Sequence, residues 1–145
     1  ITLVPPFALP KEYTVVQLKQ AVSQAVQLCV QQKHLPFTVQ VNGFGAFAER
    51  TLFAHVEAHS SWNFIREILF SCIENELPGA VRKSKKPFTP HITIANRDIP
   101  TGTIDKALMH FAQLELQETF VADTITVFER TVHGTWRVLC HYAVT

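Results

Sequence analysis

Hydrophobic and polar residues follow one another along this 145-residue chain with a period that changes from stretch to stretch. Over Val15–Gln32 the apolar residues recur every three or four positions, which is the period of an amphipathic helix. Thr14 and Gln17 have the spacing of a capping box at its start. Leu35-Pro36 closes the pattern, because the residue before a proline avoids helical geometry. The sequence therefore predicts a long first helix that begins after Thr14.

Other stretches alternate between apolar and polar residues, which is the period of a half-buried strand. Gly43 and Gly45 are expected to turn the chain between two of these strands, and His133-Gly134-Thr135 is a plausible hairpin turn between the last two. The expected strands are Ile1–Val4, Phe37–Val41, Thr51–Glu57, His91–Ala95, Ala122–Arg130 and Trp136–Val144.

Two shorter helical patterns complete the chain. Ser61 can cap one of them, which ends near Leu77-Pro78-Gly79, and the other spans Ile104–Leu114. Strands thus come in pairs between helices, and this order favours an α+β fold with antiparallel sheets. The residues expected on the buried stripe of the middle helix are Trp62, Ile65, Leu69 and Ile73.

The composition narrows the class of protein. Hydrophobic residues make up 47% of the chain, which excludes intrinsic disorder. The formal net charge of +1 excludes a general electrostatic attraction to nucleic acid or to a membrane, so any nucleic-acid contact must be local. No apolar run approaches the ~20 residues that cross a bilayer, and no signal peptide is evident. Cys29, Cys72 and Cys140 are odd in number and lack a CxxC motif, which favours free thiols in a reducing cytoplasm.

The most informative residues for chemistry are His91 and Thr93. Residues i and i+2 of a strand point the same way, so these two side chains share one face, whereas Ile92 and Ile94 are expected to anchor the other face in the core. An imidazole beside a hydroxyl combines an acid or base with a hydrogen-bond donor, which suits phosphoryl chemistry near neutral pH. On the spacing alone, a solvated strand end is the alternative.

A second candidate site consists of His55, Glu57 and His59, which could align on one strand face as zinc ligands. The alternation is expected to fail as the chain runs into the next helix, and no fourth ligand is apparent. We therefore expect no metal. No Walker loop or Rossmann fingerprint is present, which excludes the common nucleotide-cofactor classes. No Gly-x-Ser-x-Gly motif is present either, which excludes the common hydrolases that use this serine motif.

The sequence Pro-Phe-Thr-Pro-His-Ile-Thr-Ile at residues 87–94 closely resembles the second His-x-Thr motif of the 2H phosphoesterase superfamily, the relatives of 2′,5′-RNA ligases and RNA 2′,3′-cyclic phosphodiesterases. The start, Ile-Thr-Leu-Val-Pro-Pro-Phe, resembles the first motif without its His, and Phe37–Glu57, with Gly43, Gly45 and Phe47, resembles the middle strand pair. The first-motif His would directly precede Ile1. We therefore expect one N-terminally incomplete domain over residues 1–145.

The resemblance implies a bilobal α+β fold, in which two pseudo-symmetric antiparallel sheets, with helices outside, face a central groove. It implies that His91 is one of two acid–base residues, that Thr93 and Thr2 hold phosphate oxygens, and that no metal or other cofactor is needed. The implied activity is hydrolysis of 2′,3′-cyclic phosphates at RNA ends or on small nucleotides, with possible 2′,5′-RNA ligase-like activity, by a cytoplasmic monomer without membrane contact. The alternative is a non-catalytic RNA- or nucleotide-binding module on the same fold. Further candidate substrate contacts are Lys86 and Arg97 for phosphates and Phe7 and Phe88 for bases.

Overall fold

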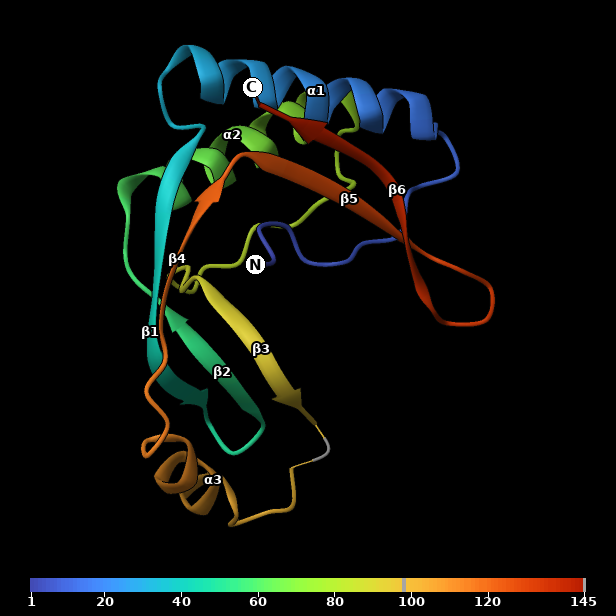
Figure 1. The fold of residues 1–145 in the computed structure, drawn as a ribbon. Coiled ribbons are helices and arrows are strands. Elements are labelled where there is room, and N and C mark those ends of the chain that lie inside the picture. Colours follow the sequence, from blue (N-terminus) through green and yellow to red (C-terminus); the bar gives the residue numbers. More distant parts are fainter. Residues whose placement is uncertain (98, 145) are drawn as a thin grey trace. The chain divides into compact units, whose positions relative to one another are not determined.

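The computed structural model describes residues 1–97 and 99–144, and within them three helices and six strands are formed (Figure 1). The mixture of helices with two separate antiparallel sheets confirms the predicted α+β class. The helices are α1 (Val15–Gln31), α2 (Ser60–Glu76) and α3 (Ile104–Phe111). The strands are β1 (Phe37–Phe47), β2 (Thr51–Val56), β3 (His91–Asn96), β4 (Gln117–Ala122), β5 (Thr124–Arg130) and β6 (Trp136–Ala143).

The chain divides into two compact units, and each unit is assembled from three separate segments. The sheet unit, as we call it, contains most of the β1–β4 sheet together with α3. Its segments are Ile1–Leu3, Thr38–His59 and Phe88–Phe120. The helix-pair unit contains α1, α2 and the β5–β6 hairpin, and its segments are Val4–Phe37, Ser60–Pro87 and the chain from Val121 onward.

The sheet unit is built on four strands in the order β3-β2-β1-β4. β2 pairs antiparallel with both β1 and β3. The predicted turn at Gly43 and Gly45 is wrong, because β1 continues through both glycines to Phe47. Gly43 has a φ of 70° and lies where the register shifts between Val41 and Phe44. Its left-handed backbone is therefore absorbed by a β-bulge and does not reverse the chain.

The end of the sheet unit differs from the sequence prediction in two ways. α3 ends at Phe111, and the next residues continue only as a tight turn in which the Leu114 N–H donates to the Phe111 carbonyl at 2.9 Å. The sequence does not predict β4. Gln117–Val121 are all exposed, and a strand with neither face buried has no need for alternating apolar and polar residues. α3 packs through two apolar side chains, since Ile104 is buried and the Phe111 ring lies against Phe44 at a centroid distance of 4.9 Å.

α1 begins with the capping box that the sequence predicts. The Gln17 N–H donates to the Thr14 hydroxyl at 3.3 Å, and the Thr14 N–H donates to the Gln17 side-chain oxygen at 2.9 Å. Both groups would otherwise be unpaired at the helix start. The face of α1 that is buried carries Leu18, Ala21, Val22, Ala25, Val26 and Cys29.

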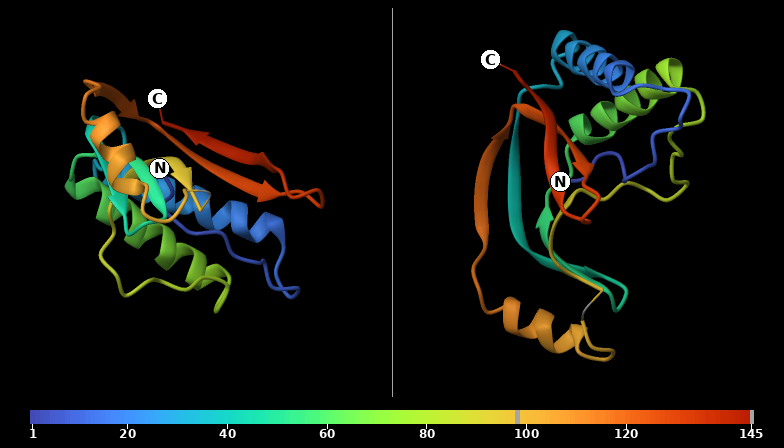
Figure 2. Two further views of the ribbon diagram at one scale, coloured as in Figure 1. Left: turned by 90° about the horizontal axis from the view of Figure 1, so that it is seen from below. Right: turned by 90° about the vertical axis from the view of Figure 1, so that its right-hand side faces the viewer.

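α2 lies alongside α1 in the helix-pair unit (Figure 2). The four predicted buried residues of α2 are confirmed. Ser61 is not its cap, because the helix begins at Ser60. Ser61 is instead buried at 2% exposure, and its hydroxyl lies 3.1 Å from His34 Nδ1.

The β5–β6 hairpin is joined to α1 by a long-range hydrogen bond, in which the Tyr142 hydroxyl donates to the Lys19 carbonyl at 2.7 Å. Trp136 and Val138 alternate with Cys140 along β6, but both are more than half exposed and lie outside the core. A register shift between Val127 and Phe128 changes which side chains face inward along the pair.

Candidate active site

His91 and Thr93 lie on β3, an edge strand of the four-stranded sheet. Their Cα partners on β2 are His55 and Phe53. Directly opposed residues of an antiparallel pair project to the same face. The four side chains therefore lie on one face of the sheet, where His91 is half-buried and Thr93 is exposed.

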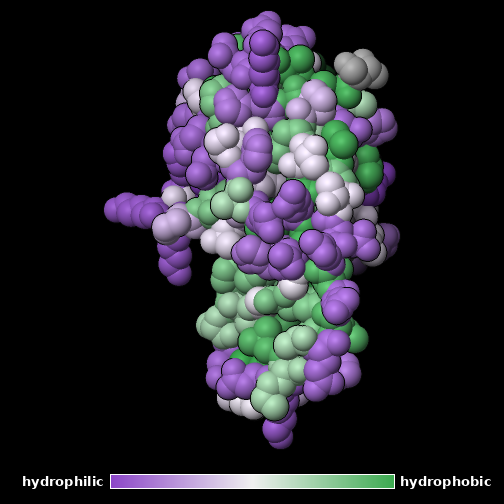
Figure 3. Space-filling view, turned by 60° about the vertical axis from the view of Figure 1, so that its left-hand side comes forward, coloured by the Kyte–Doolittle hydropathy of each residue, from purple (hydrophilic) through white to green (hydrophobic). Residues whose placement is uncertain are grey.

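The opposite face of β3 does not enter the core. Ile92 and Ile94 are 38% and 44% exposed, so the prediction that they anchor the strand is wrong. An edge strand has a neighbour on one side only, and its side chains are covered less than those of a central strand. Apolar surface extends over the sheet unit, which forms the lower part of the space-filling view (Figure 3).

The His91 ring is held by the backbone that leads into β3. Its Nδ1 lies 2.8 Å from the Thr89 carbonyl oxygen. A carbonyl oxygen only accepts hydrogen bonds, so Nδ1 must carry the proton in the neutral ring. The lone pair is then on Nε2. His91 thus has the tautomer of a base at Nε2, and after it takes up a proton it has the N–H of an acid at the same atom.

Two aromatic rings lie against the His91 imidazole. Phe47 on β1 meets it edge-on at a centroid distance of 4.9 Å and an angle of 84°, and Phe53 on β2 lies 5.3 Å away. The sequence did not single out Phe53, because its contact with His91 depends on how β2 and β3 pair. Alternation alone does not supply that pairing.

Thr2 belongs to the same compact unit as His91. The N-terminal end of the chain lies near the start of β3 (Figures 1 and 2). The predicted strand at Ile1–Val4 is wrong, because these residues do not have strand geometry and the chain bends at Leu3 and Val4. The convergence of the Thr2 hydroxyl with His91 stays a prediction.

The remaining candidate contacts are divided between the two units. Phe88 and Arg97 flank β3 in the sheet unit, and Lys86 is an exposed residue of the helix-pair unit. Arg97 has a φ of 70°, and its N–H donates to the Arg50 carbonyl at 2.9 Å. A left-handed backbone is uncommon outside glycine, so this hydrogen bond helps to hold an unusual local conformation directly after the motif strand.

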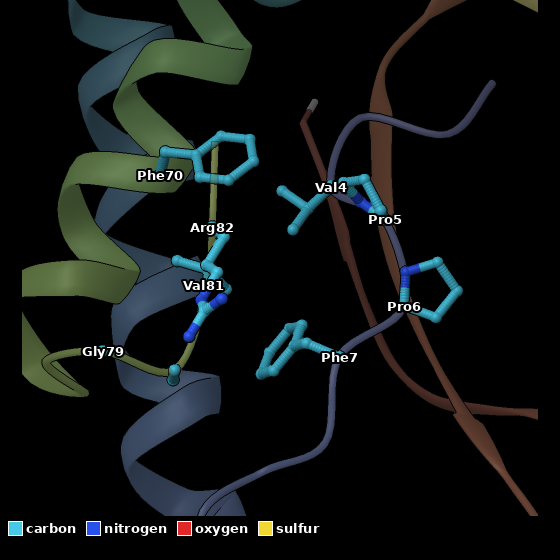
Figure 4. Close-up of a pocket in the computed structure, with 9 residues that line it drawn as sticks. Val4, Pro5, Pro6, Phe7, Phe70, Gly79, Val81 and Arg82 are labelled. Atoms are coloured by element: carbon cyan, nitrogen blue, oxygen red, sulfur yellow. The ribbon is translucent and has the colours of Figure 1, made fainter. Parts of the chain in front are cut away.

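Phe7 lines a pocket of about 250 Å³ that lies wholly within the helix-pair unit (Figure 4). Its ring points toward Val81 and Arg82, and Val4 points toward Phe70. The pocket joins apolar walls to one exposed cation, Arg82. The full lining is Val4, Pro5, Pro6, Phe7, Phe70, Gly79, Ala80, Val81 and Arg82.

The alternative metal site is not supported. Over residues 1–97 and 99–144, no group of three His, Cys, Asp or Glu side chains could hold a metal ion. His55 is on β2, but Glu57 and His59 follow the end of that strand, so the alternation that would align them does not continue. Nor does any helix of the described chain combine the length and apolar character needed to cross a membrane.

Comparison with known proteins assigns the family. Residues 1–134 match the profile of the 2'-5' RNA ligase superfamily, so this chain belongs to that superfamily. The match confirms the resemblance inferred from residues 87–94. The solved structure of TT0787 from Thermus thermophilus is similar to this fold, with a TM-score of 0.61 and 22% sequence identity over 92% of this chain and 73% of that one. No curated protein matches the sequence.

Proposed function

We propose that this protein is a metal-independent phosphodiesterase that hydrolyses 2′,3′-cyclic phosphates, either at RNA ends or on small nucleotides. The observation that carries the proposal is the anchored imidazole of His91, whose Nδ1 is tied to the Thr89 carbonyl while Thr93 shares its face of the sheet. Membership of the 2'-5' RNA ligase superfamily supports the same class of reaction.

In the proposed reaction, water attacks phosphorus and one ester bond of the cyclic phosphate breaks. One proton leaves the water, and one proton is given to the ribose oxygen that departs, so the product is a phosphate monoester. His91 performs one of these transfers through Nε2, and the second histidine that the family resemblance implies performs the other. The hydroxyls of Thr93 and Thr2 donate hydrogen bonds to phosphate oxygens. An RNA 5′-hydroxyl that replaced water would give the ligase-like reaction.

A non-catalytic RNA- or nucleotide-binding module remains the alternative. The described residues supply the anchored imidazole of one His-x-Thr motif, and one imidazole can hold a phosphate without completing both proton transfers. Binding of a cyclic phosphate with no product would favour this alternative.

The test is to incubate the protein with an oligoribonucleotide that ends in a 2′,3′-cyclic phosphate, and separately with a cyclic mononucleotide, in the presence of EDTA. Ring opening is followed by ³¹P NMR. We expect turnover in EDTA and a bell-shaped pH–rate curve, because one group must act as base while another acts as acid. Activity that EDTA abolishes and zinc restores would contradict the metal-independent reaction.

A further inference from the structure

A row of three residues crosses the sheet unit beside His91. Gly45 on β1, Phe53 on β2 and Thr93 on β3 are successive Cα partners. The Phe53 side chain is 5% exposed although it lies on the same face as the exposed Thr93. Neighbouring residues on that face therefore cover the Phe53 ring.

Gly45 provides the space for this ring. A Cβ atom at position 45 would lie 2.8 Å from both Cε2 and Cζ of Phe53, closer than real Cβ atoms approach other atoms. Unlike Gly43, Gly45 does not have a left-handed backbone, so conformation does not explain the glycine. The position needs glycine because the Phe53 ring lies directly over it.

The other sides of the Phe53 ring meet Phe47 and His91. The Phe47 and Phe53 centroids are 4.3 Å apart, and the two rings lie 4.9 Å and 5.3 Å from the His91 ring. We call Phe47 and Phe53, with Gly45 beneath, the aromatic support. The hydrogen bond to Thr89 fixes one nitrogen of His91, and the aromatic support limits rotation of the rest of the imidazole.

We propose that Gly45, Phe47 and Phe53 are positioning residues that fix the direction in which His91 Nε2 points. This inference rests on the proposed function, because a fixed direction matters only if Nε2 transfers a proton. Aromatic packing of ordinary core character is the competing explanation, and it would affect stability without a selective effect on the chemical step.

The kinetic test compares Gly45→Ala, Phe53→Leu and their double variant on a 2′,3′-cyclic phosphate substrate. We expect kcat to fall at least ~10-fold in both single variants with KM within about twofold, since misplacement of a proton-transfer group affects the chemical step. The double variant should be no worse than Phe53→Leu, because the added methyl clashes only with the ring that the second change removes. Phe47→Leu, at a position 38% exposed, tests the support with little risk to folding.

Phe44→Leu is the matched control, because Phe44 is a β1 ring that packs on Phe111 and not on His91. An equal loss of kcat in Phe44→Leu and Phe53→Leu would overturn the proposal, as would additive losses in the double variant.

A second readout does not require activity. The ¹⁵N shifts of the His91 imidazole report which nitrogen carries the proton, and we expect the Nδ1–H tautomer in the unaltered protein and a mixture in Phe47→Leu and Phe53→Leu. An unchanged tautomer in both variants would overturn the proposal. A third result would separate the two proposals. If the variants lose the tautomer that the unaltered protein has, but the unaltered protein hydrolyses no cyclic phosphate, the proposed function fails while the positioning of the ring stands.

Discussion

His55 on β2 and His91 on β3 stand directly opposite one another as Cα partners of an antiparallel pair. Residues in this relationship have Cβ atoms about 5 Å apart and project to the same face. A second imidazole therefore lies next to the proposed acid–base residue. The two are not equivalent, because the Thr89 carbonyl anchors His91 and no such carbonyl contact is seen for His55 in the described chain.

The first prediction concerns His91. His91→Ala should lower kcat at least ~10²-fold, the usual scale of general acid–base catalysis. His55→Gln should lower it less, since His55 lacks the backbone anchor. His133→Ala is the control, because His133 also stands two positions before a threonine but lies in an exposed turn between β5 and β6. Equal kcat losses in the His91 and His133 variants, measured by ring opening, would contradict the assignment.

The second prediction concerns the size of the ligand. Because the net charge is only +1, affinity for RNA must come from a few local contacts. Neutralising Lys86 and Arg97 to Gln should raise KM for an RNA-end substrate and flatten its salt dependence, since each lost phosphate contact removes about one unit of slope. A cyclic mononucleotide lacks the outer phosphates, and its KM should hardly change.

The control for this charge effect is the pair Lys11→Gln and Lys106→Gln. Both residues are exposed, one in each unit, and their loss changes the net charge by the same amount. An equal rise in KM for both substrates in the Lys86 and Arg97 variant would show that these residues serve the chemical step or the fold. A cyclic mononucleotide would then be favoured over an RNA end as the substrate.

The third prediction concerns the start of α1. Thr14→Ala removes the hydroxyl that accepts from the Gln17 N–H, and we expect a loss of about 1 kcal/mol in the free energy of unfolding, measured with urea. Thr14→Ser keeps an acceptor and should stay close to the unaltered protein. A similar loss in both variants would mean that the threonine methyl group, and not the cap, stabilises the helix.

The fourth prediction concerns alkaline pH. Burial raises the pKa of the Cys29 thiol from 9.0 to about 11, with a smaller contribution from nearby Cys72. As pH rises, the thiol of the unfolded chain ionises first, so this contribution to stability is complete below pH 9 and is lost between pH 9 and 11. Between pH 8 and 10 the loss should be about 1 kcal/mol. Cys29→Ala should remove this part of the pH dependence, and an unchanged slope in urea titrations would contradict the burial argument.

Local signals in the sequence were sufficient for α1. A capping box and a regular apolar period both depend on residues within a few positions, and together they place its start correctly at Val15. The same is true of the shared face of His91 and Thr93, which needs only the alternation of a strand. β4 gives no such signal, because its residues Gln117–Val121 are exposed.

The aromatic support of His91 could not be predicted, because it depends on long-range register. Gly45 meets Phe53 only because β1 absorbs a bulge at Gly43, and Phe53 meets Thr93 only because a second irregularity follows Leu52. One residue of slip in either pair would move these side chains to the opposite face. The sequence pattern therefore favours a turn at the two glycines, whereas in the structure Gly43 forms a bulge and Gly45 makes room for a ring.

The segments of the two compact units alternate along the chain, and this has a consequence for synthesis and for dissection. No single cut in the polypeptide can release either unit whole. During translation, α1 and α2 emerge well before the β5–β6 hairpin whose Tyr142 bonds to Lys19 of α1. The helix-pair unit is therefore complete only after β6 has emerged, and we expect nascent chains that lack β6 to keep apolar helix surface open to chaperones.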